Sequence, residues 1–463
     1  MTVLKRKAPL KMLYEGFKPY SHQGPAINHM LMLERKGTEA PPFSDQPAVN
    51  FRGGVLADDM GLGKTSEMLM TMKNNPKPKT LLLVPLALVE PWTTAATKAG
   101  FRCFVVGKER VWTKVSSLLP TETKASADAW DPSVPQVFIT NYDTLLHREA
   151  LVLAETWDRV VLDEAHRIRN HKSILTQKVL EIEASLRWVL TGTPVVNSLS
   201  DAVTLFAFLG IPHTPTMRWD PVYYPALMEE ILIYRSMESI RGKVRDAPPV
   251  PDEEEHVLEF ASAKERNFYR ATAEHPYDYQ FEMFLRLRQA SVSPATFNKS
   301  WTAPSTKMIG LGDLIQTDRS RKWIVFCSFH EEMRLVAEYL EDRLGLEAEQ
   351  YHGGLNQTER TATLMRARDP SCRVLLIQLQ AGGCGLNLQE FDGVVFMSPW
   401  WTSAMMEQAK ARAVRMGQKK VVKVVHLLLA IEKGLNIDTM MGTAADMKRD
   451  LLKEEFFTNR VLL

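Results

Sequence analysis

The chain has 463 residues, of which 45% are hydrophobic and 24% are charged, and its formal net charge is +2. The composition is that of an ordinary soluble globular protein, and the length predicts two or three domains rather than a single core. A basic tail along the whole chain is excluded, whereas a local basic cleft is not. Because no signal-peptide core and no membrane-length apolar stretch is present, we expect no membrane partner.

The four cysteines are scattered, at positions 103, 327, 372 and 384, and none has C-x-x-C spacing. The sequence therefore predicts no zinc site and no disulfide framework, and it favours a reducing compartment. Lys5-Arg6-Lys7 is a small basic cluster, which we interpret as part of a solvated tail at residues 1–17 rather than as a nuclear signal.

Residues 18–212 are expected to form a first α/β lobe. Helical periodicity around residues 27–33 comes first and is followed by a Pro-rich loop at residues 40–48. Short apolar runs then alternate with helix-compatible segments, which predicts a parallel sheet covered on both faces. The runs are Thr80–Val84, Cys103–Val106, Gln136–Thr140, Arg159–Leu162 and Trp188–Thr191.

Residues 213–300 do not continue the alternation of apolar runs and helical segments. We expect them to form a helical insertion and a linker. Tyr279–Ala290 is expected to be helical, and the acidic run Asp252–Glu255 is interpreted as a solvated linker. Residues 301–463 then predict a second α/β lobe that ends in a closing helix at Asp438–Leu452. Its apolar runs are Lys322–Cys327, Ala348–Tyr351, Arg373–Gln378, Gly393–Met397 and Val421–Leu428.

The stretch Gly53–Thr65 reads Gly-Gly-Val-Leu-Ala-Asp-Asp-Met-Gly-Leu-Gly-Lys-Thr. An apolar strand that runs into a glycine-rich loop and a helix is typical of phosphate binding, because the glycines let backbone N–H groups surround the anion. Lys64 is expected to reach the β and γ phosphates, and Thr65 to hold Mg²⁺. Asp58 departs from the pattern G-x-x-x-x-G-K-[ST], which has glycine at this position.

A second motif, Val160–His166, ends an apolar strand in the adjacent acids Asp163 and Glu164. Acids at the carboxyl end of a parallel strand face the ligand crevice. Asp163 is expected to hold Mg²⁺ and Glu164 to orient and deprotonate the attacking water. The alternative, a strand end with solvated acids, is disfavoured by the phosphate loop earlier in the chain.

Two further stretches have less specific patterns. Leu190–Pro194 ends the next strand, and its hydroxyls could sense the γ-phosphate, with a glycine- and proline-rich β-turn as the alternative. In Glu407–Gln418 the spacing of Gln408, Arg412 and Arg415 predicts one face of a helix. Two arginines there suit the charge on a transferring phosphoryl group, whereas a solvated basic helix face is the alternative.

Between these motifs lie the glycine-rich stretch Gln380–Leu388 and the run Ser398-Pro399-Trp400-Trp401. The glycines permit close approach of the backbone to a ligand or to the other lobe. The paired tryptophans could stack on nucleic acid or could pack between lobes, and the sequence leaves both interpretations open.

Taken together, these motifs resemble helicase superfamily two, specifically the Swi/Snf-related DNA translocases, from about Leu13 to Leu452. The order and spacing of many segments agree with that family. The segments that carry the resemblance are Leu56–Thr65, Trp157–Lys172, Arg187–Leu209, Phe284–Pro294, Trp323–Phe329, Gly382–Leu388 and Gln408–Gln418. The residues of the phosphate loop are most similar to those of the transcription-termination and post-replication-repair branch of these translocases. Residues 211–320 contain no cysteine, so a RING finger is excluded.

The resemblance implies two RecA-like lobes that clamp ATP and ratchet along double-stranded DNA. It implies that Gln23 reads the adenine, that the second-lobe arginines complete the site, and that Trp400 and residues 140–142 contact DNA or couple the lobes. The implied ATP-binding residues are Gln23, Asp58, Asp59, Met60, Gly61, Leu62, Gly63, Lys64 and Thr65. The implied Asp-Glu-Ala-His box is Asp163, Glu164, Ala165 and His166, and the coupling or DNA-contacting set is Thr191, Gly192, Thr193, Trp400 and Gln408.

Three residues depart from the family pattern. Ala411 and Ser398 stand where the family has aspartate, and Cys384 replaces a residue that is commonly valine. Ala411 could weaken the positioning of the arginines and lower the hydrolysis rate, but none of the three removes a phosphate-contacting group.

The sequence thus predicts a monomeric nuclear ATPase with Mg²⁺ as cofactor. Its expected activity is DNA-dependent ATP hydrolysis coupled to translocation on duplex DNA, which remodels protein–DNA complexes or nucleosomes in transcription or repair. One alternative is a regulator that binds DNA but has little turnover. The other is a helicase that separates strands of DNA or RNA.

Overall fold

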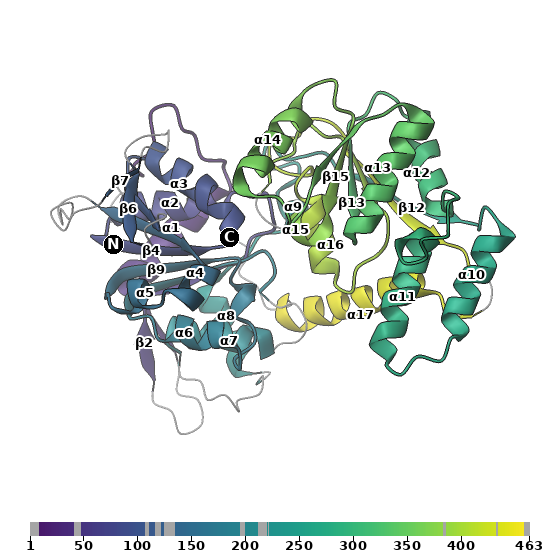
Figure 1. Ribbon diagram of the computed structural model, residues 1–463. Coiled ribbons are helices and arrows are strands. Elements are labelled where there is room, and N and C mark those ends of the chain that lie inside the picture. The colour runs from purple at the N-terminus through teal and green to yellow at the C-terminus, as the bar shows by residue number, and fades with distance from the viewer. Residues whose placement is uncertain are drawn as a thin grey trace. The chain divides into compact units, whose positions relative to one another are not determined.

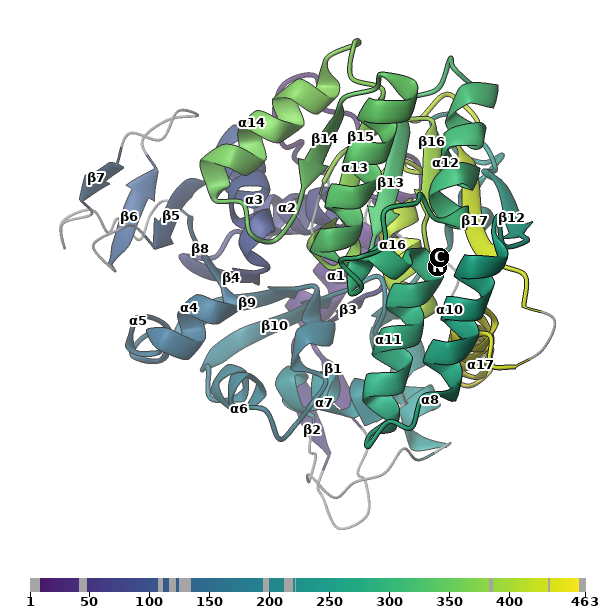
Figure 2. The same ribbon diagram turned by 45° about the vertical axis from the view of Figure 1, so that its right-hand side comes forward.

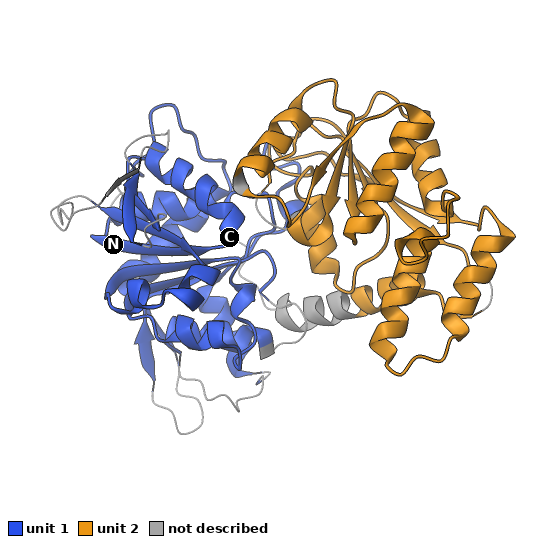
Figure 3. Ribbon diagram, viewed as in Figure 1, with its two compact units in different colours: residues 1–245, 452–463 blue, residues 246–451 orange. Residues whose placement is uncertain are grey.

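The computed structural model describes residues 9–40, 48–106, 111–115, 122–124, 135–194, 200–211, 220, 222–382, 386–431 and 434–457. The chain divides into two compact units (Figure 3): unit 1 holds residues 1–245 and 452–463, and unit 2 holds residues 246–451. The division falls inside the segment that the sequence analysis assigned to an insertion. No helix of the described residues is long and apolar enough to cross a membrane.

Unit 1 is built on a sheet of nine described strands in the order β11-β3-β10-β9-β4-β8-β5-β6-β7. The strands from β11 to β5 are parallel, and β6 and β7 extend the edge in antiparallel pairing. The strands of unit 1, which include the separate pair β1 and β2, are β1 (Thr38–Ala40), β2 (Val49–Phe51), β3 (Gly53–Leu56), β4 (Lys79–Val84), β5 (Arg102–Val106), β6 (Trp112–Val115), β7 (Glu122–Lys124), β8 (Gln136–Asn141), β9 (Trp157–Asp163), β10 (Ala184–Leu190) and β11 (Leu232–Ile233).

Helices cover both faces of this sheet (Figures 1 and 2). One face packs on α1, α2 and α3, and the other on α4 to α8. The helices are α1 (Gln23–Lys36), α2 (Lys64–Asn74), α3 (Val89–Lys98), α4 (Tyr142–His147), α5 (Ala150–Leu153), α6 (Ile174–Leu180), α7 (Ser200–Leu209), α8 (Tyr223–Ile231) and α9 (Met237–Ile240).

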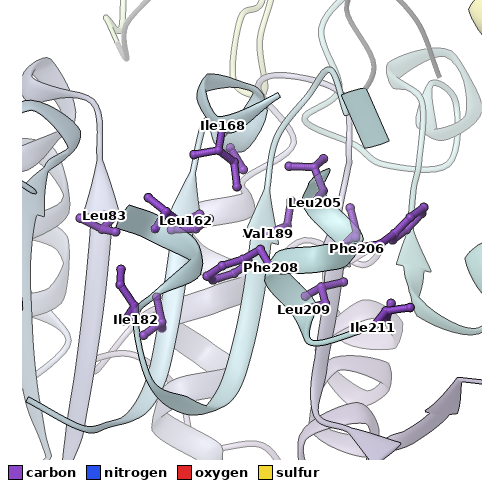
Figure 4. Close-up of a cluster of buried hydrophobic side chains, with 14 of the residues drawn as sticks. Leu83, Leu162, Ile168, Ile182, Val189, Leu205, Phe206, Phe208, Leu209 and Ile211 are labelled. Atoms are coloured by element: carbon purple, nitrogen blue, oxygen red, sulfur yellow. The ribbon is translucent and has the colours of Figure 1, made fainter. Parts of the chain in front are cut away.

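Alternating strand residues supply the two cores of unit 1, as expected for parallel strands that are buried on both sides. Leu162 and Val189 point to the core shared with α7, whereas Val161 and Leu190 point to the core shared with α1 and α2. Figure 4 shows the first of these cores, where Phe206 and Phe208 of α7 lie over the strands. The strands predicted from apolar runs are therefore confirmed, with ends that agree or differ by up to four residues.

Unit 2 holds a second sheet of six described strands, all parallel, in the order β12-β17-β16-β13-β15-β14. Its strands are β12 (Asp252–Leu258), β13 (Trp323–Cys327), β14 (Ala348–Tyr351), β15 (Val374–Gln378), β16 (Gly393–Phe396) and β17 (Lys423–Leu429). Its helices are α10 (Ala263–Glu274), α11 (Gln280–Val292), α12 (Thr306–Thr317), α13 (His330–Leu344), α14 (Gln357–Arg368), α15 (Leu379–Gly382), α16 (Ser403–Lys410) and α17 (Ile437–Phe457). The predicted helix at Tyr279–Ala290 and the closing helix are confirmed as α11 and α17.

The helices of unit 2 again divide between two faces. Met308 and Leu311 of α12 and Val336 of α13 pack on one face, and Ala367 of α14 and Ala409 of α16 pack on the other. The antiparallel pair α10 and α11 packs with the start of α17 in a separate cluster around Tyr269 and Met441 (Figure 2). Both units are thus α/β layers around a parallel sheet, which confirms the predicted fold class.

One expectation about unit 2 is wrong. The acidic run Asp252–Glu255 is not a linker, because it forms most of β12, the edge strand that pairs with β17. An edge strand bonds to one neighbour and leaves its other side in solvent, so it can carry charged residues. Glu253 accepts hydrogen bonds from His426 of β17 and from Lys410, and these contacts lower its pKa to about 2.

A second expectation fails in the arginine motif. Helix α16 ends at Lys410, and residues 411–417 form turns, so Arg412 and Arg415 do not continue the helix face of Gln408. The backbone N–H of Arg412 bonds to the carbonyl of Ala409, and the N–H of Gln418 bonds to the carbonyl of Arg415, both with the i to i−3 spacing of tight turns.

Candidate nucleotide site

The phosphate loop and the acidic motif lie at the same edge of the sheet of unit 1. Leu56, the last residue of β3, is in register with Leu190 of β10, and Leu190 is in register with Asp163 at the end of β9. Because the three strands are parallel, the loop that follows Leu56 and the acids at residues 163 and 164 leave the sheet on one side. The structure therefore brings together two motifs that are about a hundred residues apart in the sequence.

The loop has the backbone of an anion-binding turn. Gly61 and Gly63 have φ of 87° and 96°, in the left-handed region that favours glycine. A Cβ on Gly63 would also lie 2.4 Å from the side-chain nitrogen of Gln23. Lys64 begins α2, and its ammonium donates to the carbonyls of Asp58 and Asp59 at 2.6 and 3.4 Å. Its positive charge and the N-terminus of α2 thus lie beside the loop, which suits a phosphate group.

The residues before α1 hold the far side of this loop. The amide of Gln23 donates to the carbonyl of Leu62 at 3.2 Å, and the His22 ring nitrogen Nε2 lies 3.0 Å from the same oxygen. Burial lowers the pKa of His22, so the ring is held in its neutral form. The predicted adenine contact of Gln23 stays a prediction, since its amide here contacts the loop itself.

Asp163 is a buried carboxylate with two donors. Its Oδ2 accepts from the indole of Trp92 at 2.7 Å, and its Oδ1 accepts from the backbone N–H of Glu164 at 2.9 Å. Burial and the neighbouring charge of Glu164 raise the pKa of Asp163 to about 6. The Tyr142 hydroxyl donates to the carbonyl of Asp163 at 2.7 Å and fixes the backbone there. A carboxylate that is so oriented by Trp92 is a suitable ligand for Mg²⁺.

Glu164 has φ of 51°, the one positive φ of a residue other than glycine among the described residues. This backbone conformation costs on the order of 1 kcal/mol or more and is found mostly at functional positions. Its carboxylate Oε2 lies 3.4 Å from Nδ1 of His166. The two acids therefore differ in environment, since Asp163 is enclosed by donors whereas Glu164 stands beside an imidazole.

The Thr191-Gly192-Thr193 turn approaches the phosphate loop. A Cβ on Gly192 would lie 2.8 Å from Cγ of Met60 and 3.6 Å from the ammonium of Lys64. The hydroxyl of Thr193 is buried and has no hydrogen-bond partner among the described residues. A buried hydroxyl without a partner, in the turn whose Gly192 approaches Lys64, fits a site that receives a polar group, and a nucleotide phosphate has the required acceptor oxygens.

The predicted site residues of the second lobe lie in unit 2. Arg412 is buried, with 7% of its surface exposed, and Gln408 is exposed to 5%. The guanidinium of Arg415 donates to the carbonyl of Leu386 at 3.4 Å. Ala411 lies in the turn after α16, and the departure at Cys384 lies outside the described residues.

The paired tryptophans contact α11 within unit 2. The Arg288 guanidinium lies 4.6 Å from the ring centre of Trp400, and the rings of Trp401 and Phe284 are 5.8 Å apart. The hydroxyl of the neighbouring Ser398 is buried without a partner among the described residues. Part of the surface of both tryptophans is thus used in packing against α11, and contact with nucleic acid stays a prediction.

Comparison with known proteins assigns both halves of the chain. Residues 22–240 match the SNF2-related domain, and residues 306–417 match the helicase conserved C-terminal domain. The chain is an ATP-hydrolysing, helicase-like enzyme. The SNF2-related domain contains the phosphate loop, the Asp-Glu-Ala-His box and the Thr-Gly-Thr turn, and the helicase C-terminal domain contains both arginines.

Three curated relatives illustrate the range of similar proteins. The probable global transactivator of Orgyia pseudotsugata multicapsid polyhedrosis virus is 29% identical over 94% of this chain and 91% of its own length. Mouse SWI/SNF-related matrix-associated actin-dependent regulator of chromatin subfamily A member 1 is 26% identical over 81% of this chain. DNA repair protein rad8 of Schizosaccharomyces pombe is 24% identical over 82% of this chain.

This chain spans only 39% of the mouse relative and 50% of the yeast relative. Among solved structures, the Sulfolobus solfataricus SWI2/SNF2 ATPase core in complex with dsDNA is 20% identical. The superposition covers 97% of this chain and 99% of the Sulfolobus chain, with a TM-score of 0.42.

Sequence reasoning missed several residues around the site of the SNF2-related domain. Trp92 binds the carboxylate of Asp163 from a distance of 71 residues, and Arg235 contacts Asp58 from a distance of 177 residues. One signal for Arg235 was available. An acid at a position where the loop pattern has glycine requires a partner if it is buried, and Asp58 is 0% exposed.

Proposed function

We propose that this enzyme is stimulated by DNA and uses ATP hydrolysis to translocate along the duplex, displacing or remodelling protein–DNA complexes. The observation that carries the proposal is the convergence of Lys64, Asp163 and Thr193 at one sheet edge, in a chain whose second half matches a helicase C-terminal domain. The names of the relatives, which include a chromatin regulator and a DNA repair protein, support DNA as the polymer.

In this proposal the roles of the site residues follow from their surroundings. Lys64 and the loop N–H groups bind the phosphates, and Gln23 contacts the base. Thr65 and Asp163 would hold Mg²⁺, which neutralises charge on the phosphates when it is bound. Glu164 orients the attacking water and takes its proton. Arg412 and Arg415 contribute positive charge from unit 2.

The DNA-binding mode is proposed to be independent of base sequence. A motor has to pass every sequence, so contacts to phosphates are expected to dominate, and binding then weakens with salt. We place the activity in the nucleus, with a monomer acting on protein-bound duplex DNA such as a nucleosome. The branch of transcription-termination and repair translocases is our proposal for its closest function.

The test is the ATPase rate of the full chain with no nucleic acid, duplex DNA, single-stranded DNA or RNA, compared with Lys64→Ala. We expect duplex DNA to stimulate the wild type and to leave the variant at background. A rate that duplex DNA does not raise above that of Lys64→Ala contradicts the proposal.

A triplex-displacement assay separates movement on duplex DNA from strand separation. Displacement of the third strand without release of a single strand from a forked duplex supports translocation. Strand release, or stimulation by RNA alone, would instead indicate a helicase. A wild type that binds duplex DNA without turnover would indicate a regulator.

A further inference from the structure

The segment that follows β11 contacts both acidic residues of the phosphate loop. The Arg235 guanidinium donates from Nε to Oδ1 of Asp58 at 3.1 Å and from Nη2 to Oδ2 of the same carboxylate. Nη2 also donates to Oε1 of Glu67 in the first turn of α2, at 2.6 Å. All three side chains are closed to solvent, with residue exposures of 2%, 0% and 0% for Arg235, Asp58 and Glu67.

The same arginine reaches the segment before α1, because Nη1 donates to the backbone carbonyl of His22. The adjacent His22 ring and the Gln23 amide contact the carbonyl of Leu62 in the loop. Arg235 therefore joins the start of the loop, the helix that begins at Lys64 and the segment that carries Gln23.

Hydrogen bonds of Ala57 and Asp59 add to the contact between the phosphate loop and the segment that follows β11. The N–H of Ala57 bonds to the carbonyl of Ile233 at 2.8 Å, and the N–H of Asp59 bonds to the carbonyl of Arg235 at 3.0 Å. The carboxylate of Asp59 in turn accepts from the N–H of Met237 at 2.7 Å. Residues 57–59 thus run beside residues 233–237 beyond the end of the sheet.

The charges around Arg235 explain why this position requires an arginine. Two buried carboxylates face one guanidinium, and burial together with the charge of Asp58 raises the pKa of Glu67. A buried carboxylate is tolerated when it is paired and hydrogen-bonded. The planar fork of arginine can bond both oxygens of Asp58 and still reach Glu67, whereas a lysine ammonium has one point of attachment.

We propose that Arg235 is a positioning residue of the nucleotide site, which holds the phosphate loop through Asp58 and Glu67. Asp58 and Glu67 lie on the two sides of Lys64 along the chain, so one guanidinium fixes both ends of the loop. The loop N–H groups and Lys64 are thereby held ready for phosphate before ATP binds, which lowers the ordering required on binding. The inference rests on the nucleotide site proposed above.

A purely structural role for Arg235 is the competing explanation, and the chain contains a matched control. Arg159 of β9 is also buried and pairs with both oxygens of one carboxylate, at 2.7 and 2.6 Å from Glu34. It lies four residues before Asp163, toward the opposite end of its strand, and has no contact with the phosphate loop among the described residues. Each arginine thus makes a buried, two-point contact with one carboxylate, so replacing either of them removes a similar interaction.

The test compares Arg235→Lys, Arg159→Lys and Asp58→Asn in the full chain. For each, the melting temperature, the dissociation constant for a fluorescent ATP analogue with Mg²⁺, and KM and kcat for ATP are measured. We expect both lysine variants to melt earlier, whereas only Arg235→Lys weakens ATP binding and raises KM, by about tenfold. Asp58→Asn, which keeps the side-chain size, is expected to weaken ATP binding in the same direction.

A double variant, Arg235→Lys with Asp58→Asn, is expected to bind ATP no more weakly than the worse single variant, because both changes remove one interaction. If Arg235→Lys leaves the ATP affinity and KM within about twofold of wild type, as Arg159→Lys is expected to do, the positioning role is wrong. If Arg235→Lys does not fold, Asp58→Asn with wild-type ATP affinity overturns the inference. A wild type that neither binds nor hydrolyses ATP overturns the proposed site itself.

Discussion

The two adjacent acids at the end of β9 have different surroundings, and we proposed different roles for them. Asp163 is held by Trp92 and by the backbone N–H of Glu164, so its orientation is fixed by contacts within the protein. Glu164 is placed by a strained backbone with φ of 51°. We infer that the strain is kept because it directs the Glu164 carboxylate away from the enclosed position of Asp163.

Glu164→Gln is therefore expected to stop turnover and to preserve ATP binding. Glutamine has the size of glutamate and keeps an acceptor oxygen, but it cannot take a proton from water at neutral pH. We expect kcat to fall by about 100-fold or more, with the dissociation constant for ATP changed by less than about threefold. Steady-state hydrolysis and equilibrium binding measure the two effects. A kcat close to that of wild type would show that another group is the base.

Gly192→Ala tests the close approach of the Thr-Gly-Thr turn to the phosphate loop. The added Cβ would meet Met60 at 2.8 Å and lie 3.6 Å from the Lys64 ammonium. Because Met60 is flexible, we expect less than about 1 kcal/mol of lost stability, but a several-fold lower kcat/KM for ATP, since Met60 of the phosphate loop has to shift.

Gly442→Ala is the control for this change, because Gly442 lies in α17 with nothing within 4 Å of its added Cβ. It should leave the ATPase unchanged and raise helix stability by about 0.5–1 kcal/mol. Equal kinetics for the two variants would argue against coupling between the Thr-Gly-Thr turn and Lys64.

At the residue scale, the sequence predicted functional groups from local motifs and missed the contacts that distant residues make to them. Lys64, Asp163 and Glu164 each stand in a short pattern with a chemical meaning. Trp92 and Arg235 stand in no pattern, because their roles arise only when folding places them next to Asp163 and Asp58. Asp58 did mark the place of the second contact, since a buried acid in a phosphate loop requires a cation.

Secondary structure was predictable where burial dictates the residue types. Strands that are covered on both faces read as apolar runs, and so β4, β9, β13 and β15 could be located from the sequence. Strand β12 was not predicted, because it is an edge strand that is stabilised by its pairing with β17 and by ion pairs rather than by an apolar sequence. The end of α16 at Lys410 was not predicted, because the polar groups that follow keep a helical spacing in the sequence while their backbone bonds change between i to i−4 and i to i−3 spacing.

Helix α13 gives a prediction about pH. Glu332 lies in its first turn and accepts from the N–H groups of Ser328 and Phe329 at 2.7 and 3.0 Å. Burial raises the pKa of Glu332 to about 7, although these N–H donors and the nearby charges of Lys307 and Arg288 lower it in part. A raised pKa in the folded state means that the stabilisation is complete below the ordinary value of 4.5 and is lost as the pH rises through 7.

The free energy of unfolding should therefore fall by about 2–3 kcal/mol more between pH 5 and pH 8 in the wild type than in Glu332→Gln. The glutamine keeps an oxygen for the two N–H donors but does not titrate. Urea unfolding of both proteins at the two pH values measures the difference. Parallel pH profiles would show that the Glu332 carboxyl is ionised throughout this range.

At the scale of the whole molecule, the residues to which we assign roles in hydrolysis are divided between the two units. Lys64, Asp163 and Glu164 belong to unit 1, and Arg412 and Arg415 belong to unit 2. Each sheet places its own motif residues by strand register or by a turn, so each half can be rigid by itself. The proposed function therefore requires residues of both units for hydrolysis.

Arg415→Ala tests this dependence in the full chain. The Arg415 guanidinium donates to the carbonyl of Leu386 at 3.4 Å, so the melting temperature of the variant is measured beside its activity. If Arg415 stabilises charge on the transferring phosphoryl group, kcat falls by about 1,000-fold or more, and ATP affinity stays within about threefold of wild type.

Arg366→Ala is the matched control, since Arg366 of α14 is an exposed arginine that pairs with Glu349 on the surface of unit 2. Exposed ion pairs contribute little to stability because water screens them, so this variant should keep full activity and nearly full stability. Loss of ATP binding together with turnover in Arg415→Ala would indicate a structural role. Full turnover in Arg415→Ala would mean that unit 1 hydrolyses ATP without this arginine, and the dependence on both units would then require another residue of unit 2.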